Sequence, residues 1–443
     1  MGWLDFLLPR RDRIETYPDE MPAAVLTPRR PRAPAAPRPR GFRVSATENA
    51  GAGERAHMRL RDAFTPSQPV RDPTMLAGRE ELLTNMIRAI EDQRLHLVLF
   101  GDRGMGKTSL LHVLSNLASE ARYIVHYSSC DEGSDFSDIF RAAADQVPLL
   151  YHRDHKPTGA ATEGGATLAS LLPEQKLAPR HVTDVFARLT GTRVLIILDE
   201  FDRSAPGLFR RQVAELIKNL SDRSTRVQLV VAGVAANLTE LIEHIPSIRR
   251  NIVGLAVPNM TREEVADLIR KGERASEFGF EERAVDMIVY LAAGSPYIAS
   301  LLGQHAGLLA ADRGGQSVAT EDVTAAIGRA ADEIADRISE RSRYDVDRAH
   351  EAGLVETLPP LAHAALRSGG RFGPEALSDQ VSDPAVRAAT LQRIERDYGL
   401  IEQIKDDPGR RYRFREEGVP IYLWIRFARD DISRAQKGAS ARV

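Results

Sequence analysis

The stretch LVLFGDRGMGKTSLLHVL, residues 97–114, decides the fold of this chain. Its first part is an apolar run of the kind found in buried strands, and its last part has the spacing of an amphipathic helix. Between them, residues 101–108 match the pattern G-x-x-x-x-G-K-[ST] in full. A strand before this pattern and a helix after it are the context of a phosphate-binding loop. The alternative is a glycine-rich turn that binds nothing.

The residue types in this loop each have a physical reason to bind a nucleotide. Glycines let successive backbone N–H groups converge on phosphate oxygens, and the helix adds the positive end of its dipole. Lys107 supplies a charge for the β- and γ-phosphates, and the Thr108 hydroxyl is a ligand for Mg²⁺. We therefore expect ATP and Mg²⁺ as cofactors, with contacts from the whole loop: Gly101, Asp102, Arg103, Gly104, Met105, Gly106, Lys107, Thr108 and Ser109.

A second acidic site follows the apolar run at residues 194–198. Asp199 emerges at the end of this predicted strand and is expected to hold Mg²⁺. Glu200 lies on the opposite side of the pleat, where it could polarise a water for in-line attack on the γ-phosphate. Asp202 is either a further acidic neighbour or only the N-cap of a helix. A single Asp-Glu pair could close an ordinary turn, and its pairing with the phosphate loop favours the catalytic interpretation.

The composition of the chain excludes several classes of protein. Cys130 is the single cysteine, which excludes a disulfide framework and a cysteine-based zinc site. A formal net charge of -2 points to neither nucleic acid nor membrane. Apolar runs all fall short of the roughly 20 residues of a membrane span. We expect a cytoplasmic protein.

The chain divides into segments of different composition. Residues 1–63 are rich in Pro, Arg, Ala and Gly and are expected to be disordered. This segment carries an apolar tip, WLDFLL at residues 3–8, which is either a frayed end without a role or a docking peptide for a partner groove or a membrane surface. Residues 436–443 are expected to be a second disordered tail.

The remaining residues show three kinds of pattern. Strands alternate with helices over residues 64–259, which predicts a mainly parallel sheet covered on both faces. Helical patterns alone follow over 260–345, the first of them opened by a capping box of Thr261 and Glu264. Residues 346–435 read as three helices and a two-stranded hairpin, the layout of a winged helix.

These motifs resemble those of the AAA+ ATPases, in particular the branch of origin-recognition ATPases and STAND-like signalling NTPases. The resemblance extends over about residues 64–430 and implies an α/β P-loop NTPase core, a helical AAA+ lid and a winged-helix domain. MLAGREELL at residues 75–83 is similar to the family segment beside the adenine, which implies nucleotide contacts from Gly78 and Arg79. AAGSPYIASLLG at 292–303 resembles the sensor-2 helix of the lid, which implies a contact from Pro296.

Oligomeric members of this family place an arginine finger on a neighbour's nucleotide. The segment NLTELIEHIPSIRRNI, residues 237–252, is similar to the one that bears it. Arg249 and Arg250 are the candidates because a guanidinium binds two phosphate oxygens and stays charged. Either one reaches a neighbouring subunit in an ATP-dependent homo-oligomer, or both lie on a solvated helix face or in an intramolecular salt bridge.

The sequence departs from the family pattern at two positions. A polar sensor-1 residue is usual at the end of the fourth strand, but here Gly233 and Ala235 lie there and Asn237 is the nearest polar candidate. Tyr297 follows the Gly-x-Pro turn of the lid where an arginine is common. Both departures suggest slow hydrolysis, as in a molecular switch.

The C-terminal domain leaves two kinds of partner open. Residues 385–415 carry arginines that could neutralise DNA phosphates, but acidic residues interleave with them, so DNA and protein contacts both stay possible. The first hypothesis is therefore an ATP-binding, slowly hydrolysing AAA+ switch that controls contact with an unknown protein partner through the lid and the winged helix. The others are an ATP-regulated DNA-binding initiator or regulator, and a nucleotide-bound scaffold that acts through residues 3–8.

Overall fold

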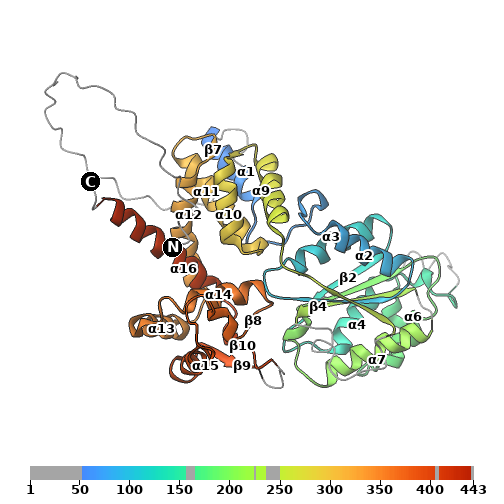
Figure 1. Cartoon of the computed structure of the whole chain (residues 1–443). Helices are drawn as coiled ribbons and strands as arrows, with labels where there is room; N and C mark the ends of the chain where they lie inside the picture. Colours follow the sequence, from blue (N-terminus) through green and yellow to red (C-terminus); the bar gives the residue numbers. More distant parts are fainter. Residues whose placement is uncertain (1–51, 156–164, 224–225, 236–249, 405–408, 441–443) are drawn as a thin grey trace.

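The computed structural model describes residues 52–155, 165–223, 226–235, 250–404 and 409–440. An α/β core forms one side of the molecule, and two mainly helical regions form the other side (Figure 1). Within the described residues, no helix has both the length and the apolar character that crossing a membrane requires.

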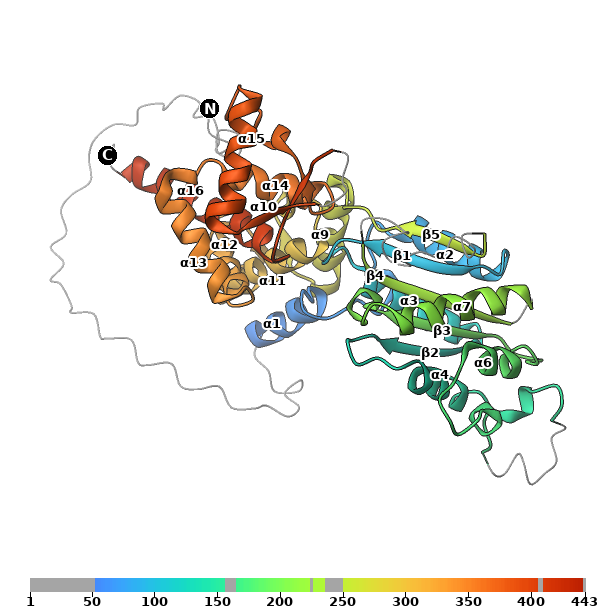
Figure 2. The same cartoon turned by 90° about the horizontal axis from the view of Figure 1, so that it is seen from below.

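The core is built on a parallel sheet, as the alternation of strands and helices predicted. Among the described residues its five strands lie in the order β2-β3-β4-β1-β5 (Figure 2). Every pairing is parallel, so the carboxyl ends of the strands lie at one edge of the sheet. The strands are β1 (His96–Gly101), β2 (Ile124–Ser129), β3 (Val194–Asp199), β4 (Val227–Val234) and β5 (Ile252–Ala256).

Helices cover both faces of this sheet. Successive residues of a strand point to opposite faces, and β1 shows it: Leu97 and Leu99 belong to one apolar cluster and Val98 to the other. The first cluster includes helices α2 (Glu80–Glu91) and α3 (Lys107–Glu120). The second includes α4 (Phe136–Asp145), α6 (Pro179–Phe186) and α7 (Leu208–Asp222). The predicted α/β P-loop NTPase fold class is confirmed.

A helical lid follows the core. It contains α9 (Arg262–Ser276), α10 (Glu282–Ala292), α11 (Pro296–Asp312) and α12 (Thr320–Ala335), with a parallel pair of short strands, β6 (Gly279–Phe280) and β7 (Ser317–Val318). The predicted capping box opens α9. The Thr261 hydroxyl accepts from the Glu264 N–H at 3.2 Å, and the Glu264 carboxylate accepts from the Thr261 N–H at 2.7 Å.

Removal of this cap should lower the stability of the chain. Thr261→Ala leaves the Glu264 N–H without its side-chain acceptor and is expected to lower the free energy of unfolding by about 1 kcal/mol. Thermal unfolding followed by circular dichroism measures the effect. Thr84→Ala is the matched control, because the Thr84 hydroxyl donates to the Glu80 carbonyl inside a helix and caps nothing. Equal midpoints for the two variants would contradict the assigned cap.

The C-terminal region contains helices and a small antiparallel sheet. The predicted hairpin is present as β9 (Ile401–Gln403) and β10 (Tyr412–Phe414), and a short strand that the sequence did not predict, β8 (Arg371–Phe372), pairs with β10. The winged-helix assignment and the domain boundaries stay predictions. One apolar cluster runs from the lid into this region. The helices are α13 (Glu340–Ala349), α14 (Leu358–Arg367), α15 (Pro384–Arg393) and α16 (Val419–Ser440).

The disorder predicted for residues 1–63 is wrong for the last part of that range. Residues Ala52–Ala63 form helix α1, which packs on α9 and α11 of the lid. Leu60 and the adjoining Phe64 are fully buried there. A short amphipathic helix was hidden by the average composition of its surroundings. Residues 1–51 lie outside the described part.

The disorder predicted for residues 436–443 is also wrong in part. The backbone of α16 continues as a helix to Ser440. The sequence from 428 to 440 contains neither proline nor an early glycine to end the helix that begins at Val419. Residues 441–443 lie outside the described part.

Candidate nucleotide-binding site

The phosphate loop connects β1 to α3 and has the backbone conformation that only glycine adopts readily. Gly106, the N-cap of α3, has φ = 87°. Gly101 has φ = 151°, and a Cβ atom placed on it would lie 2.7 Å from the Val257 carbonyl oxygen. The close approach of Val257, which follows β5, therefore requires glycine at the start of the loop.

Lys107 is the first residue of α3, and its side chain turns back onto this loop. Its Nζ donates to the carbonyl oxygens of Gly101 at 2.8 Å and Asp102 at 2.7 Å. Burial lowers the pKa of the ammonium, and the nearby carboxylates of Asp202, Asp102 and Asp199 oppose that shift. The positive charge thus lies near Asp199 at the end of β3 and Asp202 just after it, at the carboxyl edge of the sheet.

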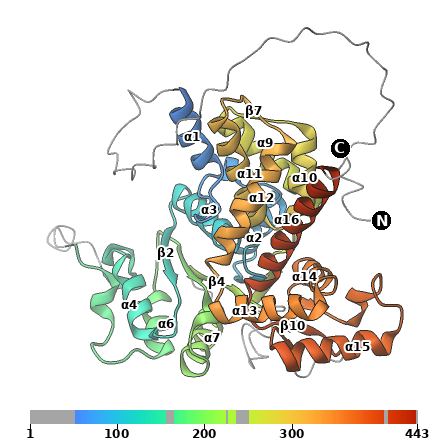
Figure 3. The ribbon, with the colours of Figure 1, turned by 90° about the vertical axis from the view of Figure 1, so that its left-hand side faces the viewer.

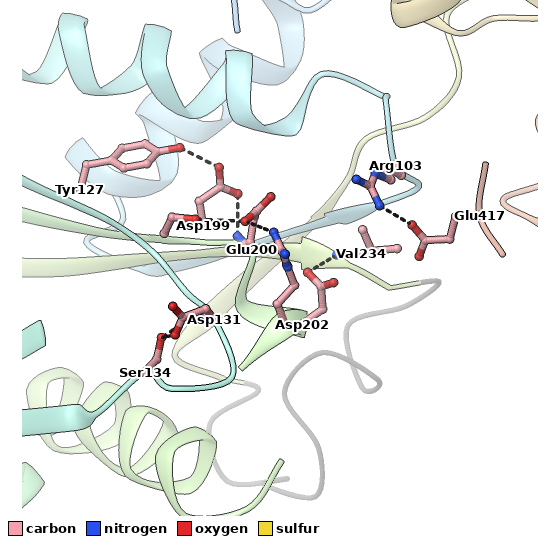
Figure 4. A network of polar contacts seen from close by, with 11 residues as sticks. Arg103, Tyr127, Asp131, Ser134, Asp199, Glu200, Asp202, Val234 and Glu417 are labelled. Atoms are coloured by element: carbon pink, nitrogen blue, oxygen red, sulfur yellow. Dashed lines mark hydrogen bonds and ion pairs between the residues drawn. The ribbon is translucent and has the colours of Figure 1, made fainter. Parts of the chain in front are cut away.

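Asp199 is the most buried of these acidic residues. Its carboxylate is buried and accepts from the Tyr127 hydroxyl at 2.7 Å and from the Glu200 N–H at 2.8 Å (Figure 4). The Tyr127 ring stacks on His112 of α3, with ring centroids 4.6 Å apart. Burial and the bond to Asp199 raise the pKa of Tyr127, so the phenol stays a donor. Tyr127 was not among the predicted site residues, and its place near the end of β2 was the only signal for it.

Glu200 lies directly after the last residue of β3. It has a left-handed backbone conformation with φ = 52°, which is uncommon for a residue with a side chain. Its carboxylate accepts from the Ser129 hydroxyl at 3.1 Å and from the Arg203 guanidinium at 2.8 Å. The side chain is half-exposed at the edge of the sheet, so water can reach it.

Asp202 joins the loop after β3 to the end of β4. Its carboxylate accepts from the Val234 N–H at 2.8 Å (Figure 4). The N-cap of the following helix α7 is Gly207, so Asp202 is an acidic neighbour of the site and not a helix cap. It lies at the strand end where the family resemblance implies a sensor-1 residue. Asn237, the predicted candidate for that role, lies outside the described residues.

The donor set fits a magnesium nucleotide. Lys107 and the N-terminus of α3 would provide positive charge for phosphates, and the oxygens of Thr108 and Asp199 are the kind that Mg²⁺ prefers. Among the described residues, no group of three or more His, Cys, Asp or Glu side chains could hold a metal alone. Mg²⁺ bound through one or two protein oxygens, with phosphates and waters completing its shell, is the usual arrangement for such sites.

The predicted adenine-side residues lie at a junction between core, loop and lid. The buried Arg79 guanidinium donates to the carbonyl oxygens of Pro258 at 2.6 Å and Met105 at 3.5 Å, and burial lowers its pKa. A Cβ atom on Gly78 would lie 2.6 Å from Cγ of Glu264. Arg79 therefore holds the phosphate loop to the connection between core and lid, and its contact with adenine stays a prediction.

The start of α11 lies against the phosphate loop. A Cβ atom on Gly106 would lie 4.0 Å from Pro296, and one on Gly104 would lie 3.5 Å from Cβ of Tyr297. The structure thus brings Pro296 close to the loop, and its contact with the nucleotide stays a prediction. Ser109, another predicted ligand, accepts from the Val70 N–H at 3.1 Å through its hydroxyl. Its present contact is therefore with the segment before α2.

The C-terminal region also contacts the phosphate loop, which the sequence did not predict. The Arg103 guanidinium pairs with the Glu417 carboxylate at 3.3 Å (Figure 4). A Cβ atom on Gly369 would lie 3.5 Å from the Asp102 carboxylate. Burial raises the pKa of Asp102, and Lys107 opposes that shift. Two residues of the loop therefore face a region more than 250 residues away in the sequence.

The two predicted arginine-finger candidates are not brought to the site by any described contact. Arg249 lies outside the described residues. Arg250 is exposed at the turn before β5. The role in trans, and the homo-oligomer that it requires, stay predictions.

The arginines proposed for DNA contact are largely engaged with neighbouring groups. Arg413 pairs with Glu402 at 2.7 Å, and Arg393 approaches Asp397 at 3.9 Å. Arg387 donates to the Val381 carbonyl at 3.1 Å. DNA binding through residues 385–415 stays a prediction.

Comparison with known proteins identifies the family of this chain. The model of the family described as Novel STAND NTPase 1 (nSTAND1) matches residues 66–354, about two thirds of the chain. No curated protein matches the sequence. The matched residues include the phosphate loop, the acidic residues after β3 and the lid.

Solved structures of similar architecture align over most of the chain at low identity. A Walker-type ATPase of Pyrococcus abyssi, PABY2304, has a TM-score of 0.47 and 14% identity, over 82% of this chain and 99% of that one. Aeropyrum pernix ORC1 in complex with DNA gives 0.41 and 17%, over 82% and 95%. The Thermotoga maritima Holliday junction branch migration motor RuvB gives 0.40 and 16%, over 81% and 96%.

Proposed function

This chain belongs to the Novel STAND NTPase 1 family, and we propose that it is an ATP-dependent molecular switch. In this proposal ATP and Mg²⁺ bind between the α/β core and the lid, hydrolysis is slow, and the nucleotide state controls contact with a protein partner through the lid and the C-terminal region. Lys107 and the loop N–H groups bind phosphates, Thr108 and Asp199 hold Mg²⁺, and Glu200 orients the attacking water.

One observation carries this proposal: the phosphate loop contacts both of the other parts of the molecule. Tyr297 of the lid lies against Gly104, and Glu417 of the C-terminal region pairs with Arg103. Phosphates that draw the loop N–H groups and Lys107 toward themselves would change both contacts. A bound nucleotide would then favour the arrangement of the three parts with which it interacts more strongly.

The geometry also supports slow turnover. Glu200 is held by Ser129 and Arg203, so its carboxylate must exchange one of these bonds for a water to act as a base. The lid presents Tyr297 where an arginine is common in the family. Such an enzyme spends most of its cycle with nucleotide bound, as a switch requires.

The contact between loop and C-terminal region makes a direct prediction. Glu417→Gln removes one charge of an exposed pair worth about 0.2–1 kcal/mol, so release of a fluorescent ADP analogue should become up to about fivefold faster. Stopped-flow displacement by unlabelled ADP measures this rate. Arg103→Ala in the Glu417→Gln background should add less than it does alone, because the two residues act through one interaction.

The matched control is the neighbouring residue Glu416. Its carboxylate accepts from the N–H and hydroxyl of Ser339, within the same half of the molecule, and makes no described contact with the loop. Glu416→Gln should leave ADP release unchanged. The same acceleration in both variants would show a general loosening of the region and would contradict the proposed coupling.

A further inference from the structure

Tyr127 of β2 lies on the face of the sheet that α2 and α3 cover, near the edge that holds the acidic residues. In the pairing of β2 with β3, Ser129 lies opposite Asp199, and Tyr127 comes two residues earlier in β2. Side chains two residues apart in a strand point to the same face, so Tyr127 is the diagonal neighbour of Asp199. Its phenol spans this diagonal and donates to Asp199 Oδ2 at 2.7 Å.

The ring of Tyr127 is held by α3, the helix that follows the phosphate loop. Helix α3 lies alongside β2 (Figure 3). His112 of α3 stacks on the Tyr127 ring, with an angle of 5° between the ring planes. Thr108 and His112 are spaced i,i+4, so both lie on one face of α3. The ring stack and the hydrogen bond therefore connect the helix face of Thr108 to Asp199, the other predicted magnesium ligand.

The Asp199 carboxylate is held at both of its oxygens. Oδ2 accepts from the Tyr127 hydroxyl, and Oδ1 accepts from the Glu200 N–H at 2.8 Å. Rotation of the carboxylate about its Cβ–Cγ bond would break one or both of these bonds. A carboxylate has about four acceptor positions, so the two bonds leave room for a magnesium ion or for a water bound to it.

We propose that Tyr127 is a positioning residue of the magnesium site: it holds the Asp199 carboxylate in one orientation for the metal and, through His112, keeps it in register with Thr108. This inference rests on the proposed nucleotide site. Groups that hydrogen-bond to a metal ligand fix its orientation, and their loss typically lowers metal affinity or activity by about 10–100-fold. Tyr127 itself neither binds the metal nor transfers a proton.

A bond between a phenol and a buried carboxylate can also serve the fold alone, because a buried carboxylate needs a donor wherever it lies. The two roles change different quantities. A donor that serves only the fold contributes to the free energy of unfolding with or without nucleotide. A positioning donor changes how much Mg²⁺ strengthens the binding of the nucleotide.

The test compares nucleotide affinity with and without the metal. Isothermal titration calorimetry gives the affinity of the full chain for AMP-PNP, a non-hydrolysable ATP analogue, in excess Mg²⁺ and in EDTA. The ratio of these two affinities isolates the contribution of the metal, and no turnover enters it. Tyr127→Phe removes the hydroxyl and keeps the ring on His112. It should lower this ratio by about tenfold and leave the affinity in EDTA within about twofold.

Tyr123→Phe is the matched control. Tyr123 directly precedes β2 at the opposite edge of the sheet, and its hydroxyl also donates to a carboxylate, that of Glu91, at 2.9 Å. This variant should leave the ratio unchanged. His112→Leu removes the ring stack, keeps the phenol, and should lower the ratio by about threefold. In the Tyr127→Phe background it should add little, because both residues act through the same carboxylate.

An unchanged ratio in Tyr127→Phe would overturn the inference, and a lower thermal midpoint without nucleotide would then assign the bond to the fold. A higher ratio would also overturn it, because the phenol would then withdraw charge from the ligand and not orient it. An equal fall in Tyr123→Phe would show a general effect of losing a phenol on β2. Failure of the proposed function looks different: the unaltered chain would bind AMP-PNP equally in Mg²⁺ and EDTA, or not at all, and the inference would fall with it.

Discussion

Lys107→Ala is expected to weaken ATP binding by about 100-fold, or about 3 kcal/mol, the upper range for hydrogen bonds to a charged group. In the structure the Lys107 ammonium already bonds two loop carbonyls and is largely removed from solvent. The phosphates would replace these neutral acceptors with charged oxygens. Isothermal titration calorimetry with ATP and Mg²⁺ measures the loss directly.

A matched control distinguishes this charge from a general effect of removing a lysine. Lys176→Ala also deletes one ammonium, but its side chain is 91% accessible and its ion pair with Asp135 is long, at 4.0 Å. This variant should bind ATP as the unaltered chain does. Retained affinity in Lys107→Ala, with an unchanged thermal midpoint, would remove the phosphate-binding role of the loop and the proposed function with it.

Glu200→Gln is expected to lower the turnover of ATP by about 100-fold or more while ATP still binds, because general-base assistance contributes 10²–10⁴-fold. The amide keeps the size of the side chain and can still bond Ser129, but it cannot take a proton from water. Single-turnover phosphate release measures the chemical step, and calorimetry measures the retained affinity. The variant should therefore accumulate in the ATP-bound state.

Glu215→Gln is the control for the loss of one carboxylate from the core, because Glu215 lies on the exposed face of α7. The Glu215→Gln variant should hydrolyse ATP at the unaltered rate. If Glu200→Gln hydrolyses ATP at the unaltered rate, another group activates the water. Asp202, close enough to Lys107 to influence its pKa, is then the next residue to replace.

The sequence alone predicted the parts of the site that depend on local patterns. The phosphate loop is a run of adjacent residues between a strand and a helix, so its place at the carboxyl edge of the sheet follows from chain order. Asp199 ends a fully buried strand and Glu200 follows it, and that burial pattern was visible as an unbroken apolar run at residues 194–198. The capping box at Thr261 was predicted for the same reason.

Contacts between distant segments could not be predicted in this way. Tyr127 and Asp199 are 72 residues apart, and Arg103 and Glu417 are 314 apart. Glu417 is the second of two adjacent glutamates after a run of arginines and aromatic residues, RYRFREE at 411–417, in which no single residue stands out. Helix α1 was missed because two apolar anchors, Leu60 and Phe64, carry its packing within a polar, alanine- and arginine-rich segment.

The burial of Phe64 in the lid has a mechanical consequence. Its ring fills the space beside Gly272 of α9 and Gly303 of α11, where any side chain at either glycine would collide with it. The polypeptide therefore crosses between lid and core twice, once after Phe64 and once after Val257. Two crossings oppose twisting and sliding of the lid and leave rotation about the line that joins them as its softest motion. In the proposed switch, the lid would then move relative to the core along this one rotation.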